Sequence, residues 1–195
     1  MLSLCIDTAY KYLTCVLIKD DEILASVSRV CFKRQSEEMF IALNEVFNSA
    51  NIDKNSIDSI CISEGPGSYT GTRIAMTLAK TIGETLPCDV YTISTLRLYA
   101  SGLANTMVIM NARADRAYVG VYNNNDILID DCVMNIAEIN AKGYSVIGDG
   151  SLIGKDDYYP DLSLAFLKTK SVWKKVEKIA FLVPKYLKES ESYLK

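Results

Sequence analysis

The sequence predicts an α/β fold in which a β-β-β-α-β-α-β-α series is followed by a similar but shorter one. Three observations lead to this expectation. Apolar and β-branched residues form three consecutive strand-like segments at the start of the chain. The apolar residues then recur at helical spacing, and a Gly/Pro-punctuated loop joins the next strand to a second helix. Strands that alternate with helices in this way are typical of an α/β architecture.

The first half of the chain, residues 1–102, carries the clearer pattern. Met39, Leu43 and Val46 recur at helical spacing after the three strand-like segments. We expect strands at 2–6, 12–18, 22–30, 57–63 and 90–93, and helices at about 36–51, 72–86 and 94–101.

The second half, residues 103–195, is expected to form a smaller subdomain. We expect strands at 107–110, 117–122, 127–133 and 144–147, a helix at 136–141, and further helical segments from about 162 and from 171. Because no Pro-rich or Ser-rich linker separates the two halves, we expect them to pack together.

Composition narrows the class of protein. Apolar residues make up 49% of the chain and charged residues 23%, as in ordinary globular proteins. Because no apolar run approaches a membrane span and Asp7 interrupts the first one, we expect a cytoplasmic protein without membrane contact. Histidine is absent and the six cysteines include no CxxC pair, which predicts neither a metal site nor disulfides. A net charge of −3 argues against a stand-alone nucleic-acid-binding protein.

A glycine-rich loop, Glu64–Arg73, joins a predicted strand to a predicted helix, where free backbone N–H groups and the helix dipole favour an anion. It matches neither a Walker P-loop nor a GxGxxG fingerprint. The alternative is a tight turn, in which the glycines only permit unusual dihedral angles. The candidate nucleotide or anion site joins the end of the first strand to this loop and consists of Asp7, Thr8, Gly65, Gly67, Ser68 and Gly71.

The two long predicted helices carry more apolar residues than one buried face requires. In the second helix we expect Ile74, Leu78 and Ile82 to face inward, which leaves a ridge of small residues outside. That ridge either receives a partner helix or packs on the neighbouring helix of the same subdomain. The candidate partner interface consists of Phe40, Ile41, Phe47, Ala75, Met76, Ala79 and Gly83.

Several segments together resemble the TsaB (YeaZ) family over nearly the whole chain. The first half contributes LCIDTA, the segment Gln35-Ser36-Glu37-Glu38 and SEGPGSYTGTRIAMTLAKTI, in which GPGSYTG-TR is the most specific part. The second half contributes Asn111-Ala112-Arg113, Gly148-Asp149-Gly150 and Pro184-Lys185-Tyr186-Leu187. Two departures are Asn111, where the family has Asp, and the lack of a histidine before Ser36.

The resemblance implies an actin/hexokinase/Hsp70-like (ASKHA, ribonuclease H-like) pair of βββαβα-type subdomains, of which the second is reduced. It also implies a non-catalytic scaffold or activator, which works with a TsaD-like catalytic paralogue and a TsaE-like ATPase. That complex would form threonylcarbamoyladenosine beside the anticodon of tRNAs that read codons beginning with A, and tRNA would be contacted only through the complex. The family is compatible with a homodimer through the helices of residues 1–102. It implies no cofactor of the chain's own, and it allows a nucleotide at the partner interface.

Two enzyme alternatives stay open. The main one is a small ASKHA-fold ATP-dependent phosphotransferase, with Asp7 positioning a metal and residues 65–71 holding phosphate, although residues 103–195 make a cramped second subdomain. A glycoprotease would need metal ligands that a histidine-free chain supplies poorly.

A lysine cluster around Trp173 would meet tRNA or an acidic partner, or it is a solvated helix face. Its members are Lys168, Lys170, Lys174, Lys175 and Lys178.

Overall fold

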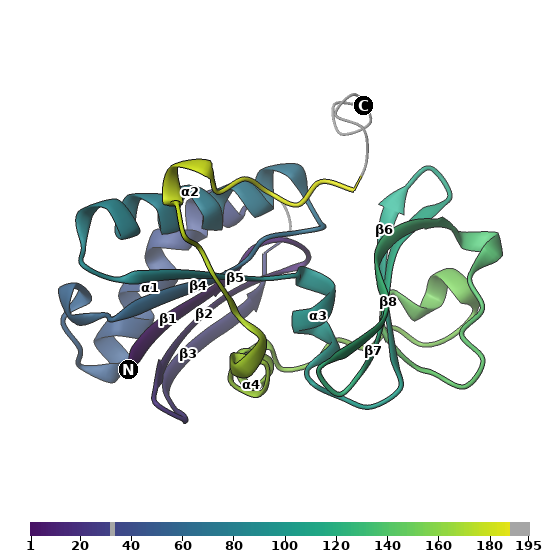
Figure 1. Ribbon diagram of the computed structural model, residues 1–195, viewed down its shortest axis with the longest axis horizontal. Coiled ribbons are helices and arrows are strands. Elements are labelled where there is room, and N and C mark those ends of the chain that lie inside the picture. Colours follow the sequence, from purple (N-terminus) through teal and green to yellow (C-terminus); the bar gives the residue numbers. More distant parts are fainter. Residues whose placement is uncertain (32–33, 188–195) are drawn as a thin grey trace.

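The computed structural model describes residues 1–31 and 34–187 and contains two mixed β-sheets (Figure 1). The first sheet has the strand order β10-β5-β4-β1-β2-β3, and the second has the order β8-β7-β6-β9. The strands are β1 (Leu2–Asp7), β2 (Tyr12–Lys19), β3 (Glu22–Val30), β4 (Ser59–Ser63), β5 (Asp89–Ile93), β6 (Thr106–Arg113), β7 (Arg116–Asn123), β8 (Asp126–Asn135), β9 (Ser145–Gly148) and β10 (Lys174–Lys175). The α-helices are α1 (Gln35–Ala50), α2 (Tyr69–Thr85), α3 (Thr95–Ala100) and α4 (Leu162–Lys168). The predicted α/β class is confirmed.

The first sheet is covered on both faces, which explains why its inner strands are apolar almost throughout. Leu4 and Ile6 of β1 pack in the core beneath α1 and α2, whereas Cys5 packs in a second core on the opposite face. This alternation follows from the two-residue period of a strand. Helices α3 and α4 and the second sheet lie on the side of Cys5 (Figure 1).

The core on the side of Cys5 joins the two sheets. Val16 and Ile18 of the first sheet share one apolar cluster with Val108 and Met110 of the second, and Tyr99 of α3 is buried in the same cluster. The two subdomains therefore share a common core, to which α3 and α4 contribute. No helix in the described part of the chain is long and apolar enough to cross a bilayer.

The structure corrects two expectations for the second half. The helix expected at 136–141 is a single 3₁₀ turn, Ile136–Glu138, which follows β8 directly. The helical segment expected from 171 is mostly extended, because β10 pairs with β5 at the edge of the first sheet. Helix α4, which belongs to the second half of the chain, packs against β2 and β3 of the first sheet. Residues 188–195 of the expected unit 103–195 lie outside the described residues.

Candidate functional site

The glycine-rich loop packs on the loop that follows β1. Helix α2 begins at Tyr69, and Ser68 caps it by accepting a hydrogen bond from the Gly71 N–H through its Oγ at 3.2 Å. The Ser68 N–H donates to the carbonyl oxygen of Ala9 at 2.7 Å, and the Thr8 hydroxyl donates to the carbonyl oxygen of Gly71 at 2.7 Å. Two N–H groups at this helix start are thus satisfied within the chain.

Glycine is required in this loop by the closeness of the two backbones. A Cβ on Gly67 would lie 2.3 Å from the carbonyl oxygen of Ala9, and one on Gly71 would lie 2.2 Å from that of Thr8. Such distances leave no room for any side chain. The geometry therefore favours the tight-turn alternative over a phosphate cradle at these two positions.

Asp7 lies in the core and is fully buried. Its carboxylate accepts hydrogen bonds from the hydroxyls of Ser63 and Tyr99, the latter at 3.3 Å, and from the Ala9 N–H at 3.3 Å. Burial raises the pKa of Asp7 to about 6, because desolvation outweighs the lowering by these three donors. The side chain expected to face nucleotide and metal is instead enclosed by the chain itself.

A second buried carboxylate, Asp149, joins the two subdomains on one side of the shared core. It accepts hydrogen bonds from the hydroxyls of Tyr10 and Tyr159, from the Lys11 ammonium at 2.7 Å and from the Asn111 N–H at 2.7 Å. Burial alone would raise the pKa of Asp149, but these four donors outweigh it and hold the pKa below its ordinary value. Tyr10 and Lys11 follow β1, whereas Asp149 follows β9, so this cluster connects the two sheets.

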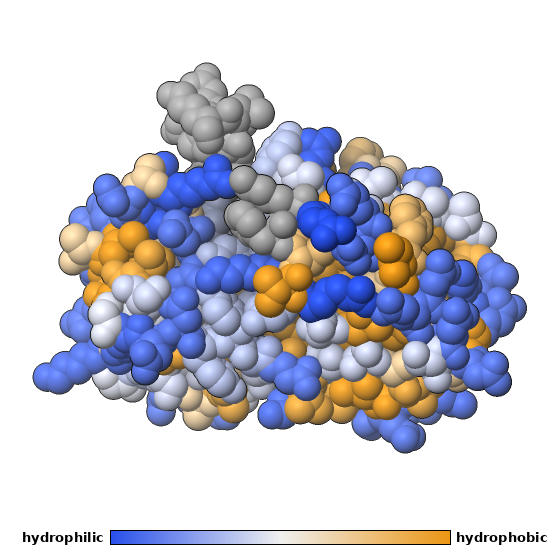
Figure 2. Space-filling model, turned by 180° about the vertical axis from the view of Figure 1, so that it is seen from behind, coloured by the Kyte–Doolittle hydropathy of each residue, from blue (hydrophilic) through white to orange (hydrophobic). Residues whose placement is uncertain are grey.

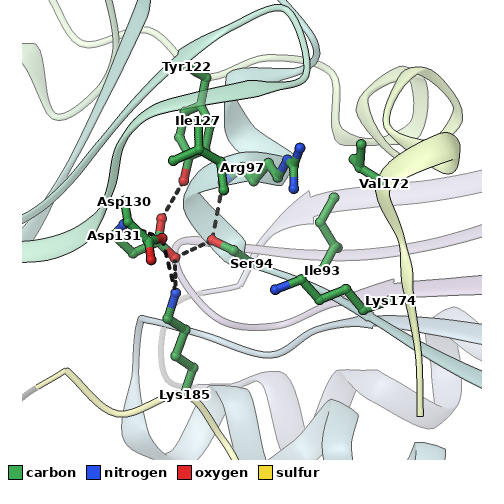
Figure 3. Close-up of a pocket in the computed structure, with 10 residues that line it drawn as sticks. All are labelled: Ile93, Ser94, Arg97, Tyr122, Ile127, Asp130, Asp131, Val172, Lys174 and Lys185. Atoms are coloured by element: carbon green, nitrogen blue, oxygen red, sulfur yellow. Dashed lines mark hydrogen bonds and ion pairs between the residues drawn. The ribbon is translucent and has the colours of Figure 1, made fainter. Parts of the chain in front are cut away.

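A third carboxylate, Asp131 of β8, makes a similar connection elsewhere (Figure 3). It accepts hydrogen bonds from the hydroxyls of Ser94 and Tyr122, and its Oδ2 lies 3.0 Å from Nζ of Lys185. Ser94 also caps α3, and Lys185 comes from the C-terminal segment, so three separate parts of the chain converge on one carboxylate. These residues line a small hollow together with Arg97 and Lys174 (Figure 3).

The candidate interface residues differ in how far they are buried. Phe40 and Ile41 of α1 are exposed to 67% and 50%. Gly83 is half-buried, and the other four are buried within the chain: Phe47, Ala75, Met76 and Ala79. The expectation that a ridge of small residues faces outward from α2 is therefore wrong.

The orientation of α2 has a packing reason. Ala75 and Ala79 face the first sheet, where their small side chains let the helix lie close to the strands. Ile74, Leu78 and Ile82, which were expected to face the core fully, are only half-buried at its margin. The outermost positions of α2 are polar, as Thr77 and Arg73 show.

The lysine cluster does not form the solvated helix face considered above, because part of it is extended. Lys174 and Lys175 make up β10, and Lys175 pairs with Asp89 at 2.7 Å. Trp173 is anchored against Tyr91 and Phe166, with ring centroids 6.2 and 6.4 Å away.

The sequence of the chain matches a known protein family. Residues 27–191 match the family model of TsaD, described as tRNA N6-adenosine threonylcarbamoyltransferase. Among curated proteins, the tRNA threonylcarbamoyladenosine biosynthesis protein TsaB of Bacillus subtilis is 30% identical over 139 residues, 68% of this chain and 60% of the relative. TsaB of Buchnera aphidicola (subsp. Schizaphis graminum) is 26% identical over 132 residues, 65% of this chain and 62% of the relative. The chain thus spans about three-fifths of the length of these relatives.

Solved structures agree on the fold. YeaZ from Pseudomonas aeruginosa superposes with a TM-score of 0.80 at 18% identity, covering 95% of this chain and 99% of that one. A protein described as similar to peptidase YeaZ, also from Pseudomonas aeruginosa, gives a TM-score of 0.82 at 18% identity, with coverage of 96% and 99%. The pair of mixed sheets, with a reduced second subdomain, is therefore the YeaZ arrangement of the ASKHA fold.

Proposed function

Because the chain belongs to the TsaB/YeaZ family, within the wider family of TsaD, we propose that it is a non-catalytic scaffold or activator in tRNA threonylcarbamoyladenosine formation. Its partners are a TsaD-like catalytic paralogue and a TsaE-like ATPase. The modified adenosine lies beside the anticodon of tRNAs that read codons beginning with A. The chain acts by docking on the catalytic paralogue, and it meets tRNA only within the complex.

The observation that carries this proposal is the burial of Asp7. An ASKHA-type phosphotransferase needs a carboxylate that reaches metal and nucleotide in an open cleft between its subdomains. Here Asp7 is enclosed by Ser63 and Tyr99, and the space between the sheets is filled by a shared core. This arrangement supports a scaffold over the phosphotransferase.

The surface of the helix layer supports a docking role. Phe40 and Ile41 expose apolar side chains on α1, which is otherwise amphipathic. Figure 2 shows hydrophobic residues in several separate patches among hydrophilic ones on one face of the molecule. Adjacent exposed apolar side chains with polar surroundings, as Phe40 and Ile41 are, favour a surface that contacts another protein. A nucleotide, where one is bound, lies at the partner interface in this proposal, and the same surface is the one that a homodimer of the free chain would use.

The test is reconstitution of tRNA modification. Purified TsaD-like and TsaE-like proteins from the same genome are incubated with ATP, the threonylcarbamoyl donor system and unmodified tRNA, with and without this chain. Modified nucleoside is quantified by mass spectrometry after digestion of the tRNA. We expect the rate to rise at least about tenfold when the chain is present, equivalent to about 1.4 kcal/mol of barrier.

The matched control is the Asp7→Asn variant, which keeps the size of the side chain. As a scaffold, the variant should support the same rate as the wild-type chain. A rate that is unchanged by the chain contradicts the scaffold role. ATP turnover by the chain alone that disappears in Asp7→Asn would revive the phosphotransferase.

A further inference from the structure

The C-terminal segment, residues 174–187, runs along the outside of the first subdomain from the edge strand β10 towards the second sheet (Figure 1). We refer to it as the strap. Its path is fixed at intervals by backbone bonds to the first subdomain: the Val176 N–H donates to the Val90 carbonyl at 2.8 Å, and the Lys185 N–H donates to the Glu64 carbonyl at 2.7 Å. Between these points it forms only one 3₁₀ turn, Ile179–Phe181.

The middle of the strap lies against α2. Ile179 fits beside Gly83, and the Lys80 ammonium donates to the Ala180 carbonyl at 3.3 Å. Leu182 turns into the core, whereas Phe181 and Val183 on either side of it are exposed to 76% and 68%. Val176 and Ile179 also pack at the margin of this core, so the strap is held by a few apolar side chains and by discrete polar contacts.

One of these contacts is an ion pair made by Lys185. Its Nζ lies 3.0 Å from Oδ2 of Asp131 and 3.6 Å from Oδ1 of Asp130 (Figure 3). The Asp131 side chain is only 1% exposed, and the hydroxyls of Ser94 and Tyr122 complete its hydrogen bonding. If the Lys185 ammonium moves away, the buried Asp131 carboxylate loses its counter-charge. The free-energy cost of this change is far larger than that of breaking a solvent-exposed ion pair.

A second lysine of the strap provides the contrast. Lys175 pairs with Asp89 at 2.7 Å near the start of the strap, but both side chains are about half exposed. Such solvated pairs contribute little to stability. Of these two ion pairs, the one at Lys185 is therefore the one able to fasten the strap.

We propose that the strap detaches from the first subdomain as a unit, and that the Lys185–Asp131 ion pair keeps it attached. When this ion pair is broken, residues 176–187 separate from α2 while both sheets stay folded, and the surface around Gly83 becomes accessible. When the ion pair is formed, Ile179 occupies that surface. The proposal concerns the free chain and stands or falls independently of the proposed role in tRNA modification.

Amide hydrogen–deuterium exchange on the full chain tests whether the strap detaches as proposed. Lys185→Met removes the ammonium and keeps the length of the side chain, Lys185→Arg keeps the charge, and Lys175→Met is the matched control on the same strap. We expect the amides of Val176, Leu182 and residue 185 to exchange at least about tenfold faster in Lys185→Met, since tenfold is equivalent to about 1.4 kcal/mol. Lys185→Arg and Lys175→Met should stay within about twofold of the wild type.

Cys61, which is buried in β4 at the centre of the first sheet, reports on the rest of the fold. Its amide should exchange at the wild-type rate in Lys185→Met. Equal acceleration at Cys61 would overturn the proposal, because the strap would then be an inseparable part of the core. Unchanged exchange along the strap, or the same acceleration in Lys175→Met, would also overturn the proposal, because the Lys185 ion pair would then not be what keeps the strap attached.

Discussion

Ile179 fills the space beside Gly83: a Cβ on Gly83 would lie 2.7 Å from Cδ1 of Ile179 and 2.6 Å from Cγ2 of Val90. Gly83 is in the last turn of α2, at the end of the row that begins with Ala75 and Ala79. The missing side chain lets both β5 and the strap approach the helix. A position expected to receive a partner helix is thus filled by the chain's own C-terminal segment.

A bulky residue at this position should destabilise the chain itself. Gly83→Leu forces Ile179 and Val90 aside, and overpacking of this kind costs about 1–3 kcal/mol. Thr77→Leu, at an exposed position of the same helix, should change the free energy of unfolding by no more than about 0.5 kcal/mol. Urea denaturation followed by circular dichroism measures both. Equal stability of Gly83→Leu and the wild type would show that the strap yields without cost.

The same helix shows what local pattern could and could not predict. The existence of α2 follows from its periodicity, but Ala75 and Ile74 lie on adjacent apolar sides, and periodicity does not say which side meets a sheet. That choice depends on how closely helix and strands approach, which is a tertiary property. For the same reason the lysine-rich start of the strap was expected to be helical, whereas pairing with β5 makes it extended.

The candidate site was predictable only in part. The close packing of Gly67 and Gly71 agrees with the tight turn that the sequence offered as an alternative. The partners of Asp149 could not be predicted from local sequence, because Tyr10 is 139 residues away in the chain. One local signal was available for Asp131: an aspartate inside a strand-forming segment is unfavourable unless it has a specific partner. Its partner Lys185 again comes from a distant segment.

The stability of the chain should depend on the protonation of Asp7. Its pKa in the folded state is raised to about 6 from its ordinary value of 3.8, so the folded state holds the proton more tightly than the unfolded state does. Stability from this group is therefore fully present below about pH 4 and falls by up to about 3 kcal/mol as pH rises to about 6. Relative to Asp7→Asn, the wild type should lose that amount between pH 4 and 7 in urea titrations. A pH-independent difference would place the carboxylate in contact with water.

The cluster around Asp149 should have the opposite pH dependence. Asp149→Asn leaves Lys11 without its buried counter-charge and should cost about 2–4 kcal/mol at pH 7. Because the folded pKa is lowered, the advantage of the wild type is present above about pH 4 and declines as pH falls below it. Asp157→Asn is the control, since Asp157 is partly exposed and 3.8 Å from Lys11, and it should cost less than about 1 kcal/mol. Equal costs would show that burial of Asp149 is unimportant.

The exposed apolar surface of α1 gives the most direct test of docking, and this prediction depends on the proposed function. Phe40 is 67% exposed, so Phe40→Glu should leave the free energy of unfolding within about 0.5 kcal/mol of the wild type. A carboxylate forced into an apolar contact without a counter-charge should weaken binding to the TsaD-like protein at least about tenfold, measured by isothermal titration calorimetry. Leu164→Glu is the matched control, because Leu164 is exposed on α4, on the other side of the first sheet. If both variants bind as the wild type does, the partner docks elsewhere. If both weaken binding equally, the loss reflects charge in general rather than the surface of α1.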